Sequence, residues 1–309
     1  MKLSKKYFGV LAGIFFSASL MTGCGGGGGS DSVAYLCFDR ADTFGGKLIG
    51  EAFEKAAQSK GLNVTYYDAK GDANLQVDQI REVMANGTKT IVLLATDGDI
   101  MATEVEKANE EGIKVITVNR GVNGGEHFDV MSDDLEAGKL QGDYMAKNLP
   151  QGATVAYIEG TNTNSSAVKR WEGFKASCLD KRPDITLLDM QDGDWSKTEG
   201  MKITALWLTL FPKIDAIVCG NDQMALGAIL ALKSAGKLQE CKVSGVDAVD
   251  DALKAIAAGE MVQTIKQDAQ KQAEGAADLA ATAVSGGSLA NVTVPFVSIT
   301  KENLSQFAK

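Results

Sequence analysis

The chain has 309 residues, and its 40 acidic against 31 basic side chains give a formal net charge of −9. This balance argues against a nucleic-acid partner, because no surplus of lysine and arginine is available to neutralise phosphates. The length exceeds what one hydrophobic core usually organises, so two domains are expected.

The chain begins with the pattern of an export signal. Lys2, Lys5 and Lys6 precede a largely apolar run, Tyr7–Met21, which ends in small residues. This run is about 15 residues long, short of the roughly 20 that a membrane-spanning helix needs. Loss of the segment with its three lysines would take the net charge from −9 to −12. No other stretch approaches the length of a transmembrane helix.

The end of this segment resembles a bacterial lipobox. The motif is Met21-Thr22-Gly23-Cys24, with Met21 where leucine is usual. The resemblance implies that residues 1–23 are a lipoprotein signal peptide and that Cys24 carries the lipid. Residues 24–30, rich in glycine, then form a flexible tether, so the membrane is contacted through the lipid anchor only. The alternative is an ordinary signal peptide that happens to end near a cysteine.

Short apolar runs and amphipathic segments alternate through the rest of the chain. Strands are expected at Val33–Phe38, Val64–Asp68, Thr90–Ala95, Val115–Asn119, Thr154–Glu159, Ile185–Met190, Ala216–Cys219 and Val243–Asp247. Helices are expected at Gly46–Lys60, Leu75–Ala85, Met101–Glu111, Leu135–Leu149, Ala167–Leu179, Lys197–Leu210, Met224–Ser234 and Lys271–Val284. Val292–Ile299 reads as a strand interrupted by Pro295, which suits a sheet edge or a crossover.

The same series of alternating strands and helices occurs twice along the chain. Continuous apolar strands with helical crossovers predict parallel sheets covered on both faces. The fold class is therefore α/β, with two similar doubly wound lobes. The join falls near Met131–Asp134 or at the break Pro150–Gly152.

Four cysteines follow Cys24, and none has zinc-type spacing, so no metal site is predicted. Cys37 and Cys219 lie in apolar runs and are expected to be buried small hydrophobes. Cys178 and Cys241 lie at the edges of elements. A disulfide between these two is left open.

Polar and aromatic residues follow most of the predicted strands. They are Asp39, Arg40, Asp42, Phe44, Thr96, Asp97, Asn119, Arg120, Asp192, Asp194, Trp195, Asn221, Asp222 and Asp247. Ligands of open parallel sheets bind beyond the carboxyl ends of the strands. Carboxylates, amides and guanidinium groups bind hydroxyls, and aromatic rings cover the apolar face of a pyranose or cyclitol, so a polyhydroxylated ligand is expected.

Some of these residues, and Arg170, also have a structural alternative. Asp97 and Asp222 are as well placed to cap helices as to contact ligand. Arg170, on a predicted helix, could be a solvated surface residue, and Trp195 and Phe44 could be ordinary core.

Four segments carry recognisable motifs. Gly220–Ala228 contains NDxMAxGA, and Val243–Asp247 is a strand that ends in Gly-x-Asp. Ile116–Arg120 is a strand that ends in Asn-Arg, and Lys169–Phe174 contains R-x-x-G-F on a helix. Together and in this order, these motifs resemble those of the ribose- and galactose-type periplasmic binding proteins of ABC sugar importers. The resemblance covers nearly everything after Ser30 and implies a type I periplasmic binding protein fold.

The resemblance implies a set of ligand-binding residues. They are Asp42, Phe44, Asn119, Arg120, Arg170, Trp195, Asn221, Asp247 and Gln267. Two departures leave the ligand open: Gly45 stands where ribose-type members carry a second aromatic, and Ala95-Thr96 stands where many members have asparagine. The calcium loop of some galactose binders is absent.

The resemblance also implies a three-segment hinge near Ser132-Asp133, Gln267-Asp268 and Val297. One lobe then comprises residues 31–131 plus 268–296, and the other 132–267 plus 297–309. The implied protein is a monomer in the periplasm or at the cell surface that captures a monosaccharide or polyol and delivers it to an ABC permease. The alternative is a ligand-sensing partner of a chemoreceptor or sensor kinase.

Enzymatic function is not expected. His127, the single histidine, lies beside Gly124-Gly125 with no neighbouring nucleophile in the sequence, which is a poor triad candidate. No phosphate-binding glycine motif follows a strand, so no cofactor is predicted.

Overall fold

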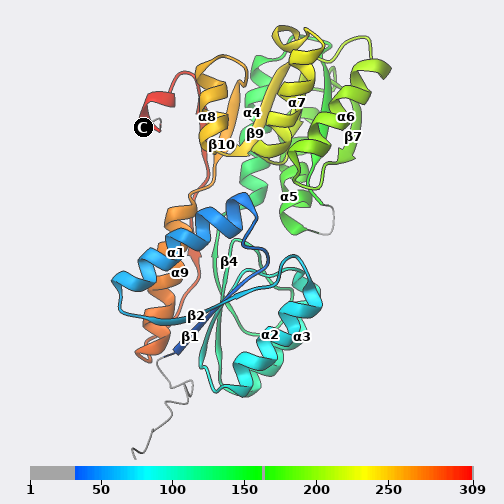
Figure 1. Cartoon of the computed structure of the whole chain (residues 1–309). Helices are drawn as coiled ribbons and strands as arrows, with labels where there is room; N and C mark the ends of the chain where they lie inside the picture. The colour runs from blue at the N-terminus through cyan, green and yellow to red at the C-terminus, as the bar shows by residue number, and fades with distance from the viewer. Residues whose placement is uncertain (1–31, 162–163, 308–309) are drawn as a thin grey trace, which may run out of the picture.

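The computed structural model describes residues 32–161 and 164–307, which form two α/β lobes stacked one above the other (Figure 1). Each lobe is built on a six-stranded sheet. The expected export segment, the lipid-bearing Cys24 and the glycine tether lie outside the described residues. Within the described ranges, none of the helices has the length and hydrophobicity needed to cross a membrane.

The sheet of the first lobe has the strand order β11-β5-β4-β3-β1-β2, and its paired strands are parallel. The strands are β1 Ser32–Cys37, β2 Asn63–Asp68, β3 Thr90–Leu93, β4 Lys114–Val118, β5 Phe128–Met131 and β11 Val292–Thr293. The helices are the π-helix η1 Thr43–Ile49, α1 Gly50–Ser59, α2 Ala73–Ala85, α3 Gly98–Glu110 and α9 Ala269–Val284.

Alternate residues of β1 belong to different cores, which shows that both faces of this sheet are covered. Tyr35 packs with Phe53 of α1 and with the alanines of α9, whereas Leu36 packs with Ile80 of α2 and Met101 of α3. Strands buried on both sides are apolar at every position, which is why the sequence marked them as continuous runs.

The second sheet has the order β12-β10-β9-β8-β6-β7, and only β12 runs antiparallel to its neighbour. Its strands are β6 Thr154–Glu159, β7 Thr186–Asp192, β8 Ala216–Cys219, β9 Lys242–Asp247, β10 Gln263–Lys266 and β12 Val297–Thr300. The helical elements are α4 Asp134–Asn148, α5 Ser165–Phe174, η2 Lys175–Leu179, α6 Lys197–Leu210, α7 Asp222–Ser234, η3 Leu238–Glu240, α8 Asp250–Ala257 and η4 Leu304–Gln306.

The predicted pair of doubly wound α/β lobes is confirmed, but β5 and β10 were not expected as strands. Both are four residues long and carry polar side chains that other groups satisfy. Asp129 of β5 accepts a hydrogen bond from the hydroxyl of Thr117, and Gln263 of β10 donates to the carbonyl of Leu140. Four residues are too few to show a strand period, and in β10 the buried polar residues Gln263 and Thr264 also interrupt the apolar pattern.

Three segments connect the lobes. The first follows β5, and α4 then packs on α5 of the second lobe, so the join lies near Met131–Asp134 and the alternative at Pro150 is wrong. The second follows β10, after which α9 packs against α1. The third contains Pro295: the single expected strand Val292–Ile299 is instead β11 in one sheet and β12 in the other. The residue limits given above for the two lobes remain a prediction.

The disulfide left open between Cys178 and Cys241 does not form. Cys178 packs with Met145 and Phe174 on one face of the second sheet, and Cys241 packs with Val243 on the opposite face. The sheet therefore separates the two sulfurs. Within the described residues all four cysteines are free and buried, as expected for Cys37 and Cys219.

Candidate functional site

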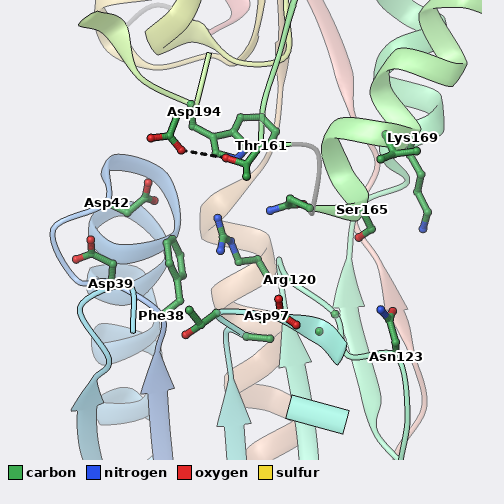
Figure 2. Close-up of a pocket in the computed structure, with 18 of the residues that line it drawn as sticks. Phe38, Asp39, Asp42, Asp97, Arg120, Asn123, Thr161, Ser165, Lys169 and Asp194 are labelled. Atoms are coloured by element: carbon green, nitrogen blue, oxygen red, sulfur yellow. Dashed lines mark hydrogen bonds between the residues drawn. The ribbon is translucent and has the colours of Figure 1, made fainter. Parts of the chain in front are cut away.

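A cavity of about 810 Å³ lies between the two lobes. Its lower wall comes from the loops that follow β1, β3 and β4, and its upper wall from the loops that follow β6 and β7 and from α5 (Figure 2). These are the carboxyl ends of parallel strands, where the sequence predicted a site.

A smaller pocket (the inner pocket) adjoins this cavity (the outer cavity) and shares part of its lining. It brings together the nine side chains predicted to bind ligand. The lining comprises Phe38, Asp42, Phe44, Gly45, Asn119, Arg120, Asn164, Ser166, Arg170, Trp195, Asn221, Asp247 and Gln267. Four of the nine come from the first lobe, four from the second, and Gln267 from the second hinge segment.

Asp42 and Phe44 lie at the start of η1. The Oδ1 atom of Asp42 accepts hydrogen bonds from the backbone N–H groups of Phe44, at 3.0 Å, and Gly45, at 2.6 Å, and so caps this helix. Phe44 is 9% exposed and packs in the core of the first lobe, with only an edge at the pocket. Most of the Phe44 ring is therefore part of the hydrophobic core.

Asn119 and Arg120 follow β4. Asn119 has a φ of 63°, a left-handed conformation that few non-glycine residues adopt. The guanidinium carbon of Arg120 lies 3.7 Å from the centre of the Phe38 ring, a cation–π contact. Burial lowers the pKa of Arg120, although the nearby Asp42 carboxylate opposes this. Phe38 was expected only as the end of a strand, and its position as the last aromatic of that strand was the available signal.

Arg170 is buried, so its interpretation as a solvated surface residue is wrong. It is 4% exposed, its Nε donates to Asp134 at 2.8 Å, and its Nη1 donates to the carbonyl oxygen of Gly220 at 2.6 Å. Its guanidinium carbon lies 5.6 Å from the Trp195 ring. Asp134, which fixes the arginine, was not singled out in the sequence because it lies in the first turn of another helix, α4.

Asp247 presents a buried carboxylate to the pocket. It ends β9 with a φ of 124° and is 8% exposed. No hydrogen bond to its carboxylate is found within the described residues. Burial raises its pKa well above the usual aspartate range; Arg170 counteracts this, and the carboxylate of Asp222 reinforces it. Gln267, 5% exposed, lies in the same pocket.

Asn221 and Asp222, at the start of α7, make different hydrogen bonds and so have different roles. Asn221 caps α7 by accepting from the N–H of Met224 at 2.9 Å. Asp222 is fully buried and accepts from Thr264 Oγ1 at 2.7 Å and from the N–H of Val249 at 3.0 Å, so it joins α7 to β10 and to the segment before α8. The capping interpretation is wrong for Asp222. It is confirmed for Asp97, which accepts from two N–H groups at the start of α3.

Trp195 is held in a strained loop. Asp194 and Trp195 have φ values of 49° and 54°, and such conformations persist where the surroundings impose them, often at functional sites. Asn221 Nδ2 donates to the Trp195 carbonyl at 3.2 Å. The buried indole Nε1 has no hydrogen-bond partner within the described residues.

The histidine lies apart from this cavity. His127 Nδ1 is 3.0 Å from the carbonyl oxygen of Gly125, and Nε2 is 3.6 Å from Asp129. Neither cavity lining includes it, so it supplies no base to the cleft. Among the described residues, no group of three or more histidine, cysteine or acidic side chains is arranged to hold a metal ion.

Comparison with known proteins agrees with this architecture. Residues 34–288 match the family model for the periplasmic binding protein domain. The ribose import binding protein of Escherichia coli (strain K12) is 33% identical over 220 residues, which are 71% of this chain and 73% of that protein.

Two solved structures share the whole arrangement. The Caulobacter myo-inositol binding protein bound to myo-inositol has a TM-score of 0.86 at 29% identity, over 90% of this chain and 96% of that one. An ABC transporter solute binding protein from Bacillus halodurans C-125 with bound myo-inositol also has a TM-score of 0.86, at 27% identity, over 92% and 98% of the two chains. The chain therefore belongs to the periplasmic binding protein family, in the sugar-binding group that includes the ribose import binding proteins, and has that family's type I fold.

Proposed function

We propose that this protein captures a monosaccharide or polyol between its lobes, closes around it and delivers it to an ABC importer. The observation that carries the proposal is the inner pocket, where the nine candidate side chains from both lobes and the hinge converge. Their chemistry suits an uncharged ligand with many hydroxyls, because carboxylates accept, guanidinium groups donate, and amides do both.

The unpaired groups of the pocket define what a ligand must supply. The carboxylate of Asp247 accepts and the indole N–H of Trp195 donates, and neither has a protein partner within the described residues. A buried polar group left unpaired costs about 1–3 kcal/mol, so a ring whose hydroxyls meet these groups is favoured over one that misses them. The ribose and myo-inositol named for the relatives above support this ligand class.

Binding is coupled to a change in the distance between the lobes. A ligand that touches Asn119 from below and Asp247 from above gains its full set of contacts only when the lobes approach. It therefore shifts the population toward the closed form by the difference between its affinities for the two states. The closed form is then the shape that an importer recognises.

The lipid anchor is part of the proposal. Lipidated Cys24, followed by the glycine tether, would hold the binding domain at the outer side of a membrane in the periplasm or at the cell surface. Export of the Cys24→Ala variant without membrane association, together with acyl labelling of the wild type, tests this. Equal membrane retention of the two proteins would contradict it.

Ligand capture is tested by thermal unfolding of the exported Cys24→Ala protein with D-ribose, D-galactose, myo-inositol, xylitol and glycerol. A ligand present at 100 times its Kd adds about 2.7 kcal/mol to the free energy of unfolding. Native mass spectrometry of the freshly purified protein would weigh a co-purified ligand. No thermal shift with any polyol of a broad panel would overturn the proposed ligand class.

Delivery is tested separately from capture. The liganded protein should bind its importer in a pull-down, and the unliganded protein should not. If the liganded protein instead binds the ectodomain of a chemoreceptor or sensor kinase, that protein replaces the importer as the partner.

A further inference from the structure

Both walls of the outer cavity carry a net negative charge. The first-lobe wall contains Asp39, Asp42, Asp97 and Arg120, a net charge of −2, and the second-lobe wall contains Lys169, Glu172 and Asp194, a net charge of −1. The inner pocket adds one acidic and one basic side chain, Asp247 and Arg170. Closing the cleft therefore brings two negative walls together.

Lys169 is the one cation that lines this cavity from the second lobe among the described residues. It lies on α5, is exposed, and makes no ion pair or hydrogen bond within the described residues. Figure 2 shows its side chain extending from the upper wall toward the wall that carries Asp97 and Asn123. It is thus a cation without an anion, and the carboxylate of Asp97 lies on the opposite wall of the same cavity.

The opposite wall offers an acceptor with free capacity. Asp97 uses Oδ1 to accept the N–H groups of Asp99 and Ile100, and its Oδ2 accepts no hydrogen bond within the described residues. Asp99 lies in the first turn of α3, and its Oδ1 accepts a hydrogen bond from Asn123 Nδ2 at 2.6 Å. Asp97, but not Asp99, lines the cavity, so the start of α3 presents one carboxylate with an open acceptor atom to the cleft.

We propose that Lys169 determines ligand affinity without touching the ligand, by pairing with Asp97 across the cleft mouth in the closed form. This inference rests on the proposed capture of a polyol by closure. The ion pair would form only as the lobes approach, so its free energy would add entirely to the closed state and hence to binding. It also offsets the repulsion between the two acidic walls at the point where they meet.

The test is calorimetric titration with myo-inositol and with D-ribose, at low and high ionic strength. Lys169→Glu should weaken binding about 10-fold at ~20 mM salt and about 2-fold at ~500 mM, because salt screens charges separated by more than a few ångströms. Lys169→Gln should weaken binding about 3-fold at low salt, an effect in the range measured for exposed ion pairs.

The matched control is Lys175→Glu. It makes the same change of charge in η2, the element that follows α5, where Lys175 pairs with Asp180 outside the cavity. Its affinity should stay within about 2-fold of the wild type at both salt concentrations, in the small range of exposed charges.

A double-mutant cycle identifies the partner. Asp97→Asn removes the charge and keeps a good helix cap, so the fold is preserved. In that background Lys169→Gln should lose most of its effect. If the wild type binds but Lys169→Glu matches its Kd and salt dependence, or if the two substitutions are additive, the inference is wrong and capture stands. If the wild type binds no polyol, the proposed function fails and takes the inference with it.

Discussion

The indole ring of Trp195 occupies the space that a side chain at Gly160 would need. A Cβ atom built on Gly160 would lie 2.2 Å from two ring carbons of Trp195, far inside contact distance. Gly160 follows β6 and Trp195 follows β7, so two adjacent strand ends together set the position of the ring. The absence of a side chain at Gly160 is thus a condition for the aromatic wall of the pocket.

This relationship predicts the effect of a single methyl group. Gly160→Ala should displace Trp195, weaken ligand binding at least 10-fold, and alter the near-ultraviolet circular dichroism of the protein. Gly50→Ala is the control, because only the Tyr35 hydroxyl, at 3.8 Å, lies near the added atom and alanine favours the helix. Unchanged affinity of Gly160→Ala would show that the ring position does not matter.

Removal of the pocket groups themselves should separate ligand contact from folding. Trp195→Ala and Asp247→Ala should each lose most of the affinity in calorimetric titrations, since one removes the ring surface and an N–H donor and the other a buried acceptor. Trp195→Phe should retain part of the binding, because the apolar surface remains. Titrations of both alanine variants that match the wild type would count against this site.

Arg170 is predicted to be essential for stability as well as binding. Arg170→Met would leave the carboxylates of Asp134 and Asp247 without their cation, and breaking a buried pair costs about 3–5 kcal/mol. Denaturant unfolding measures this loss. Lys181→Met, which breaks an exposed pair with Asp143, should change the unfolding free energy little. Similar small changes in both variants would contradict a buried structural role.

Asp222 predicts how stability depends on pH. Burial raises the pKa of this carboxyl to about 7, against about 3.9 for an unfolded chain. Between these values the folded protein holds a proton that the unfolded chain has lost. The free energy of unfolding should therefore fall as pH rises from about 4 to about 7, by on the order of 1 kcal/mol per pH unit, and Asp247 acts in the same direction.

Unfolding in urea across this pH range checks the sign. Asp222→Asn should flatten the slope, because its amide can accept from Val249 and donate to Thr264 without titrating. Asp278→Asn, a substitution at an exposed carboxylate on α9, should leave the slope as in the wild type. Stability that rises through this window would exclude Asp222 as its source.

The two-lobed α/β architecture and the candidate residues could be predicted from the amino-acid sequence alone. Apolar runs such as those at Tyr35 and Tyr157 are continuous because helices bury both faces of each sheet. Polar side chains at strand ends, together with motifs such as the one around Asn221, were enough to select nine side chains that line one pocket. These signals are local, so they can be read along the chain.

The three-dimensional structure was needed to show how those side chains are held and what they face. The burial of Arg170, the brace made by Asp222 and the separation of Cys178 from Cys241 depend on which helix lies on which face of a sheet. The strand β10 was not recognised because its buried Gln263 and Thr264 pair with groups distant in sequence. Such pairings depend on positions in space, and no local pattern of residues specifies them.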